Sequence, residues 1–396
     1  MIRASIVPFS ALLCVGAAAV AVSGCRSGVG VASSATTPNV PTTTAATTGT
    51  TPAPAPVPAP APIDLTIEAN GDFLIHSPVW MRAQQLAGGN GYNFAPMLKM
   101  IKPYVEGADL ALCHVETPMT PRPPKGYPVF NTPTALAKAI ASTGYDACDT
   151  ASNHSLDGGQ YGIDQTGFAL SRNGVKHTGS FHSESASKKI TMLEAKGVKV
   201  AYLAYTAISN GQAMPHPWSV NWASTGKILG DAKRARKQGA QVVVVNLHAG
   251  DEYVHTPSAT QMKLARALTK SSLITAIIGQ HVHVVQPIRK INNKLVVFGE
   301  GNTLSNQSAG AGLLAATQDG YLALLRIRVE PDGKAAVRRV DYVPTYVRHP
   351  DFTVVPVGWA LDRGLQPASE FKASWNRTVG TVGRTTLYAP YRKAKP

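Results

Sequence analysis

The sequence predicts a layered α/β domain, and three observations support this. From Asp64 onward, short runs rich in β-branched residues alternate with helical stretches, which is the pattern of β-sheets covered by helices. Hydrophobic residues make up 44% of the chain and aromatic residues 7%, so the chain can bury enough apolar surface to offset its conformational entropy. The N-terminal segment differs in composition, which leaves about 330 residues to fold as one domain.

The individual elements follow from hydrophobic periodicity and from glycines just beyond several helices, such as Gly144, Gly174 and Gly239. The predicted strands are Leu65–Glu68, Asp109–Cys113, Ala147–Thr150, Val198–Tyr205, Gln241–Leu247, Ala276–Ile278 and Leu295–Phe298. The predicted helices are Thr134–Ser142, Tyr161–Asn173, Ile228–Lys237 and Ser258–Thr269. A turn at Glu330-Pro331-Asp332-Gly333 predicts an antiparallel hairpin of Tyr321–Val329 with Ala335–Tyr342. We expect residues 63–345 to form the domain and residues 346–396 to wrap its surface.

The N-terminus has the features of a bacterial lipoprotein signal. Arg3 precedes an apolar stretch from Ile6 to Val22, and Val22-Ser23-Gly24-Cys25 forms a lipobox. A membrane-spanning anchor would need about 20 apolar residues, whereas this stretch is shorter and contains Pro8. We therefore expect cleavage of residues 1–24, lipidation of Cys25, and attachment to the outer face of the cytoplasmic membrane.

Residues 25–62 are almost entirely Thr, Ala, Pro and Ser and end in alternating Pro and Ala. Such a composition cannot form a hydrophobic core, so we expect a disordered tether. Polyproline-like segments are extended, and the tether would reach on the order of 90 Å from the membrane at about 3.1 Å per residue.

The charge balance favours anionic partners. The chain has 38 basic and 23 acidic residues and a formal net charge of +15, which favours contact with anionic cell-surface polymers, phosphates or lipid headgroups. Nucleic acid is not expected, because the basic residues are scattered and their only cluster, Lys233 to Lys237, fits a solvated helix face.

Two of the four cysteines fall within the predicted domain. Cys113 and Cys148 both lie on predicted strands, just before polar motifs. An exported protein can form a disulfide between them, but two buried free thiols fit the sequence equally well.

Polar residues that bind metals follow nearly every predicted strand, where open α/β sheets place their ligand sites. These segments are Gly71-Asp72, His114-Val115-Glu116, Ser152-Asn153-His154-Ser155-Leu156-Asp157, His248-Ala249-Gly250-Asp251-Glu252 and Gly279-Gln280-His281-Val282-His283. A single one would more often be a helix cap or a surface histidine, but five strand ends in succession indicate one site.

Carboxylate, amide and imidazole ligands together suit divalent Zn, Mn or Fe, and a carboxylate can bridge two ions. His281 and His283 are two residues apart, so on an extended segment both side chains would face the same metal cluster. The sequence therefore predicts a site for two divalent ions that would orient a phosphate or acyl oxygen.

In this order, the motifs resemble those of the CapA family of poly-gamma-glutamate capsule proteins, which has the calcineurin-like metallophosphatase fold. The resemblance covers roughly Leu65 to Asn306 and extends to Gln286-Pro287 and Gly301-Asn302. It implies a four-layer sandwich of mixed β-sheets flanked by helices. Three positions depart from the family's motifs: His114 and Ser152 each replace an Asn, and Gln280 replaces a His.

The resemblance also implies roles for individual residues. The metal ligands would be Asp72, Glu116, Asn153, His248, His281 and His283. His154 would protonate a leaving group or steady a phosphoryl oxygen, and Glu252 would act as a base or in a supporting position. Further supporting positions are His76, His114, Asp157 and Asn302. The opening Asp-x-His of metallophosphatases is absent, and His76 is a possible substitute for its histidine.

Three functions fit these features. The first is a metal-dependent enzyme that acts in synthesis, transfer or anchoring of an anionic envelope polymer of the poly-gamma-glutamate type, alongside other capsule-synthesis membrane proteins, with phosphoester hydrolysis as one possible reaction. The second is a non-catalytic polymer-binding or assembly subunit with a structural metal site. The third is an extracellular nucleotidase or phosphodiesterase, which ranks last because the sequence has no recognisable base-stacking element.

Overall fold

The computed structural model describes residues 60–392, which belong to one compact unit that begins at Ala59. The predicted signal peptide, Cys25 and nearly all of the tether lie outside the described residues. Among residues 60–392, no helix is both long enough and apolar enough to cross a bilayer.

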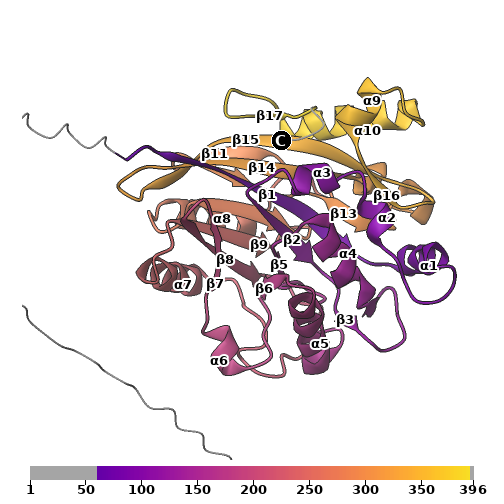
Figure 1. The fold of residues 1–396 in the computed structure, drawn as a ribbon, viewed down its shortest axis with the longest axis horizontal. Coiled ribbons are helices and arrows are strands. Elements are labelled where there is room, and N and C mark those ends of the chain that lie inside the picture. The colour runs from indigo at the N-terminus through magenta and orange to yellow at the C-terminus, as the bar shows by residue number, and fades with distance from the viewer. Residues whose placement is uncertain (1–59, 393–396) are drawn as a thin grey trace, which may run out of the picture. The chain divides into compact units, whose positions relative to one another are not determined.

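Two β-sheets pack face to face in the centre of the unit (Figure 1). The larger has nine strands, in the order β16-β15-β14-β1-β2-β5-β6, with β13 also paired to β1 and β17 to β15. The bounds of these strands are β1 Ile63–Leu74, β2 Leu110–Val115, β5 Ala147–Asp149, β6 Lys176–Thr178, β13 Asn302–Ser305, β14 Asp319–Val329, β15 Ala335–Arg348, β16 Thr353–Pro356 and β17 Tyr388–Pro390. The six-stranded sheet has the order β11-β12-β10-β9-β8-β7, with β7 Thr191–Ala195, β8 Val198–Thr206, β9 Val242–His248, β10 Ala276–Gln280, β11 Ile288–Ile291 and β12 Lys294–Val297.

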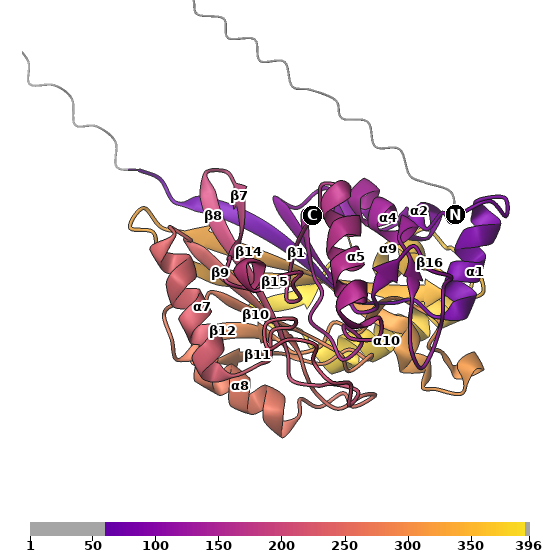
Figure 2. The same cartoon turned by 90° about the horizontal axis from the view of Figure 1, so that it is seen from below.

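Helices cover the outer faces of both sheets. The longer ones are α1 Ser77–Leu86, α4 Ala135–Thr143, α5 Gly159–Arg172, α7 Thr225–Lys237, α8 Ala259–Thr269 and α10 Ala368–Val382. The shorter ones are α2 Ala95–Leu98, α3 Lys102–Val105, α6 Glu184–Ser187 and α9 Val357–Asp362, and a small ladder pairs β3 Met119–Thr120 with β4 Thr132–Pro133. Figure 2 shows α7 and α8 along the outer side of the six-stranded sheet.

Each layer is held to the next by a buried apolar cluster. Ile67 of β1 and Leu325 of β14 meet Tyr202 of β8 and Val244 of β9 between the sheets. A second cluster joins α7 and α8 to β9, and a third packs α4 and neighbouring helices on the larger sheet. Burying these side chains supplies the main driving force for folding. The arrangement of helix, sheet, sheet and helix confirms the predicted α/β sandwich.

All seven predicted strands, all four helices and the hairpin are present, with bounds within about three residues of those expected, except that β1 continues to Leu74 and β15 to Arg348. The turn of the hairpin is closed by the Glu330 amide, which donates to the Lys334 carbonyl at 2.8 Å. The segment after β15 forms more than a surface wrapping: β16 and β17 both pair with β15, and α9 and α10 pack beside them. Short strands such as β6 and β16 are not apparent in the sequence because they contain too few residues to show a periodicity.

Cys113 on β2 and Cys148 on β5 are paired neighbours in the parallel ladder and form a disulfide. Both are buried, and each immediately precedes a polar residue of the ladder, His114 or Asp149. The bridge therefore joins the two strands that carry His114 and Asp149.

Replacing both cysteines, Cys113→Ala with Cys148→Ala, is expected to lower the free energy of unfolding by about 2 to 4 kcal/mol, because the open chain gains conformational entropy when unfolded. Chemical denaturation with and without reductant measures this. As a control, the stability of the double variant should not change when reductant is added. If the oxidised protein and the variant are equally stable, the bridge contributes nothing to stability.

Candidate metal centre

The predicted site residues meet where the carboxyl ends of β2, β5, β9 and β10 approach the end of β1. Asp72 pairs with His114 across β1 and β2, and His114 pairs with Asp149 across β2 and β5. In the other sheet, Gln280 pairs with His248. The register of both sheets thus brings polar residues far apart in sequence to one edge of the sandwich.

A close approach of two backbone segments sets the position of Asp72. The Asp72 amide donates to the carbonyl of Gly301 at 2.9 Å. A Cβ atom on Gly71 would lie 1.9 Å from that same oxygen, so only glycine fits at position 71. The Gly71-Asp72 and Gly301-Asn302 motifs are therefore the two sides of one contact.

The first ligand group consists of Asp72, His114 and His248, which are fully buried and offer ligand atoms within 4.8 Å of one another. His114 Nε2 lies 3.7 Å from Asp72 Oδ1. Its other ring nitrogen, Nδ1, is 2.8 Å from Asp149 Oδ1. His248 Nε2 is 2.8 Å from Asn153 Oδ1, so Asn153 lies directly beside this group.

The second ligand group consists of Glu116, His281 and His283, also buried and within the same 4.8 Å limit. His283 Nε2 lies 3.7 Å from Glu116 Oε1, while its Nδ1 is 2.9 Å from Asp72 Oδ2 and 3.2 Å from Asn302 Oδ1. Asp72 therefore contacts both groups, one with each carboxylate oxygen, and joins them into a single centre.

The unpaired atoms of this centre fit metal ions. His114 Nε2, His248 Nδ1, His281 Nδ1 and both carboxylate oxygens of Glu116 are buried and have no hydrogen-bond partner. Leaving such atoms without a partner costs about 1 to 3 kcal/mol each. Because all five belong to the two ligand groups, the residues present are suited to hold divalent cations by nitrogen and oxygen ligands.

The charges of the centre interact strongly. Burial alone would lower the pKa of His114, but the carboxylates of Asp149, Asp72 and Glu116 together outweigh it and raise that pKa to about 9. Burial likewise opposes protonation of His283, yet Glu116 and Asp72 raise its pKa to about 9. Burial raises the pKa of Glu116 to about 7, against the opposing effect of His283. These shifts show carboxylates and imidazoles that compensate one another in a site shielded from water.

The backbone conformation at His281 and His283 differs from the one we expected. They do not lie on an extended segment: β10 ends at Gln280, and both histidines have positive φ angles, 94° and 56°. Side chains rarely adopt this left-handed conformation, and such strain concentrates at functional sites. The turn still directs both imidazoles to one ligand group.

His114 is placed inside a ligand group, whereas the sequence assigned it to a supporting position. This placement of His114 depends on Asp149, a residue that the sequence analysis did not identify as part of the site. Its carboxylate holds His114 Nδ1 and also accepts from the Tyr202 hydroxyl and Asn246 Nδ2, each at 2.8 Å. A carboxylate that fixes one imidazole nitrogen orients the other toward a metal. A charged residue inside an otherwise apolar strand could have indicated Asp149 from the sequence, because a buried charge requires a partner.

An open pocket of about 690 Å³ adjoins the centre and contains the remaining predicted residues His76, His154 and Glu252, together with Asn153. His154 Nδ1 lies 2.8 Å from Asp157 Oδ2, so Asp157 orients His154. Neither His76 nor Glu252 belongs to a ligand group. Asn302 is in a supporting position, because it contacts His283.

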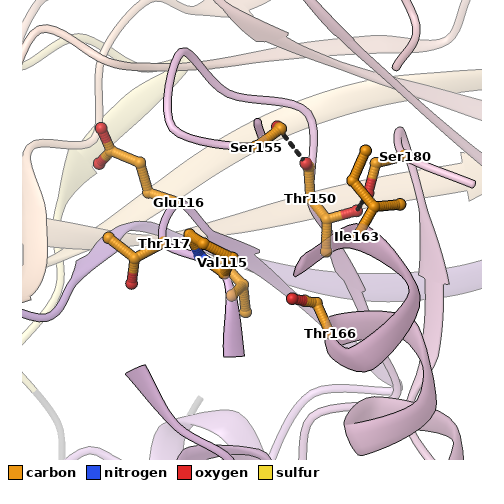
Figure 3. Close-up of a pocket in the computed structure, with 9 residues that line it drawn as sticks. Val115, Glu116, Thr117, Thr150, Ser155, Ile163, Thr166 and Ser180 are labelled. Atoms are coloured by element: carbon orange, nitrogen blue, oxygen red, sulfur yellow. Dashed lines mark hydrogen bonds between the residues drawn. The ribbon is translucent and has the colours of Figure 1, made fainter. Parts of the chain in front are cut away.

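A separate cavity of about 10 Å³ lies behind Glu116 and has room for little more than one water molecule. Figure 3 shows the Glu116 carboxyl group turned away from Thr150, Ser155 and Ser180, which line the far side of that cavity. Ser155 donates to the Thr150 carbonyl, and the Thr150 and Ser180 hydroxyls lie 2.7 Å apart. These bonds support the loop that carries Asn153 and His154.

Comparisons with known proteins agree with this geometry. Residues 66–307 match the family described as bacterial capsule synthesis protein PGA_cap. The chain is 27% identical to the capsule biosynthesis protein CapA of Bacillus anthracis over 69% of its length, and 25% identical to the PGA biosynthesis protein CapA of Bacillus subtilis over 62%. The matched regions span 66% and 64% of those relatives, slightly less than two thirds.

Among solved structures, a novel phosphatase from Mycoplasma pneumoniae aligns with a TM-score of 0.43 and 12% identity, covering 72% of this chain and 94% of that one. At this score and identity the alignment says nothing about activity. The family match covers more than half of the chain and includes both ligand groups, which confirms the resemblance expected from the motifs. The chain therefore belongs to the bacterial capsule synthesis protein family PGA_cap.

Proposed function

We propose that this protein is a metal-dependent hydrolase of the cell surface that acts in the synthesis, transfer or anchoring of a capsule polymer. The observation that carries the proposal is the pair of ligand groups joined by Asp72 beside an open pocket that contains His154. A purely structural metal site is normally closed, whereas a catalytic site keeps access to substrate. The similarity to two CapA proteins of capsule and PGA biosynthesis supports a role in capsule biosynthesis.

The two ligand groups would hold two divalent ions, Mn, Zn or Fe, one by Asp72, His114 and His248 and the other by Glu116, His281 and His283. A bound ion supplies Lewis-acid stabilisation of the negative charge that develops on a phosphate or acyl oxygen. Asn153, which lies beside His248 and also lines the pocket, would position the substrate.

His154 is the proposed proton donor. As an imidazolium, His154 would donate Nδ1–H to Asp157 and keep a second proton on Nε2; transfer of that proton to the leaving oxygen leaves a neutral imidazole. Phe130 packs edge-on against the His154 ring at 4.7 Å and restricts its rotation. Glu252, also in the pocket lining, is the available carboxylate for accepting a proton.

The substrate proposed here is an anionic envelope polymer of the poly-gamma-glutamate type or a phosphorylated precursor of one. The net charge of +15 and the lipobox at Cys25 support a protein held at the membrane among anionic wall polymers, beside other capsule-synthesis membrane proteins. The Cys113–Cys148 disulfide supports an oxidising, extracytoplasmic location.

Elemental analysis of the purified protein should find about two metal ions per chain. His248→Ala and His283→Ala should each lower that number, because each removes a buried ligand. His182→Ala, which removes an exposed histidine outside both groups, is the control and should keep the full content. Absence of metal after incubation with Mn, Zn and Fe would contradict a metal centre.

His154→Ala should lower kcat for an alkyl phosphate such as glycerol 1-phosphate, whose leaving alkoxide needs a proton, about 100- to 10,000-fold, the usual effect of losing a general acid, while the metal content stays unchanged. Asp157→Asn should cause a smaller loss, because it keeps the shape but weakens the orientation of the imidazole. Metal-loaded protein without hydrolytic activity would instead favour a non-catalytic polymer-binding or assembly subunit.

Cys25→Ala should abolish incorporation of a labelled fatty acid and release the protein from the membrane fraction, because a lipid chain is the proposed anchor. Labelling followed by membrane fractionation measures both effects. Unchanged retention of the variant in the membrane fraction would show that something other than a lipid at Cys25 holds the protein there.

A further inference from the structure

The main pocket holds few charged side chains of its own. Within the described residues, no lysine or arginine lines it, and its commonest polar side chains are the amides Asn153, Asn210, Gln212, Asn306 and Gln307. Glu252 is the only carboxylate that residues 60–392 contribute to its lining. Apart from the metal centre and its histidines, the pocket therefore offers no cationic side chain to a second anionic group on the same substrate.

A second cavity, of about 240 Å³, adjoins this pocket and has a different character. Val129 lines both, and the second cavity is further lined by Arg122 and Lys125. We call it the basic cavity. Asp157 also lines the basic cavity. The same side chain contacts His154, the proposed proton donor.

The two cations of the basic cavity are available to a ligand. Among residues 60–392, neither Arg122 nor Lys125 has an ion-pair partner, and no hydrogen bond involves the guanidinium or the ammonium group. The Arg122 guanidinium lies over the Tyr161 ring at 4.0 Å. Stacking of this kind restrains the group but leaves its N–H edges free to donate to a carboxylate or phosphate.

The carboxylate in the same cavity does not neutralise these cations. The Asp157 side chain is fully buried. It accepts from the Phe130 amide at 2.7 Å and from Gln212 Nε2 at 2.8 Å, in addition to contacting His154. Its oxygens are thus already engaged by other donors.

The segment that carries both cations is well braced. Lys125 and Asn131 exchange backbone hydrogen bonds of 2.9 and 3.0 Å. The Asn131 side chain donates to the carbonyls of Arg122 and Pro123 and accepts from Thr120 Oγ1. A braced loop presents its charges at lower entropic cost than a flexible one, which favours binding.

We propose that the basic cavity is a binding subsite for an anionic group, carboxylate or phosphate, on the unit of the substrate next to the one at the metal centre. This assignment rests on the proposed function, because it takes the neighbouring pocket to hold the reacting unit. The subsite selects substrates with at least two anionic groups in sequence.

The test uses the full-length, metal-loaded protein with the double variant Arg122→Gln/Lys125→Gln. The matched control, Lys233→Gln/Lys237→Gln, removes the same charge from exposed positions on α7. Calorimetric titrations with γ-linked tetraglutamate and with a glycerol phosphate tetramer distinguish a carboxylate from a phosphate ligand. We expect about a tenfold weaker affinity for at least one probe in the basic-cavity variant, from the loss of two charge-assisted contacts, and no change in the control.

If both double variants bind the probes equally more weakly, the effect comes from the net charge of the protein, and the proposal is overturned. Unchanged affinity of the basic-cavity variant for both probes would also overturn it. Hydrolysis of 4-nitrophenyl phosphate by the unmodified protein is measured in parallel. Absence of hydrolysis would contradict the proposed enzyme, while the titrations would still decide whether the basic cavity binds anions.

Discussion

The buried carboxylate of Asp72 is the constraint on which the rest of the site depends. Its two oxygens face different imidazoles, His114 at 3.7 Å and His283 at 2.9 Å, so one side chain links two ligand groups from both sheets. Burial alone would raise the pKa of Asp72, but the hydrogen bond from His283 and the two nearby imidazoles hold it below its usual value. A charge buried this deeply is tolerable only when it is compensated by such partners or by cations.

The fold around Asp72 explains how that compensation is maintained. β1 lies in the middle of the larger sheet, between β14 and β2, and the Gly71–Gly301 contact fixes where its end meets β13. The disulfide ties β2 to β5 one residue before His114 and Asp149. The apolar core between the sheets then holds β9 and β10 at the same edge. Stability and chemistry are coupled here, because the elements that form the core also align the ligands.

The site has two parts with different electrostatics. The metal centre is buried and densely charged, whereas the adjoining pocket has amides as its commonest polar side chains and carries no lysine or arginine among the described residues. Among the described residues, positive side chains line the cavities that adjoin this pocket: Arg122 and Lys125 in the basic cavity beyond Val129, and Arg82 in a further cavity that shares Asn306. The centre would thus match the reacting group of a substrate and the basic cavity the anionic group beside it, which is the division of roles expected for a repeating anionic chain.

The sequence by itself determined the family and the α/β class, and it indicated most of the candidate ligands. It did so because strand periodicity and chelating residue types are local properties, visible at Asp72, Glu116, His248, His281 and His283. Only the tertiary structure decided the rest. Asp149 acts on His114 from a neighbouring strand, and the turn at His281 and His283 depends on unusual backbone angles. Arg122 and Lys125 line the basic cavity because their loop is held by Asp157 and Asn131. Each of these relations joins residues through strand register or loop packing, which residue order alone does not specify.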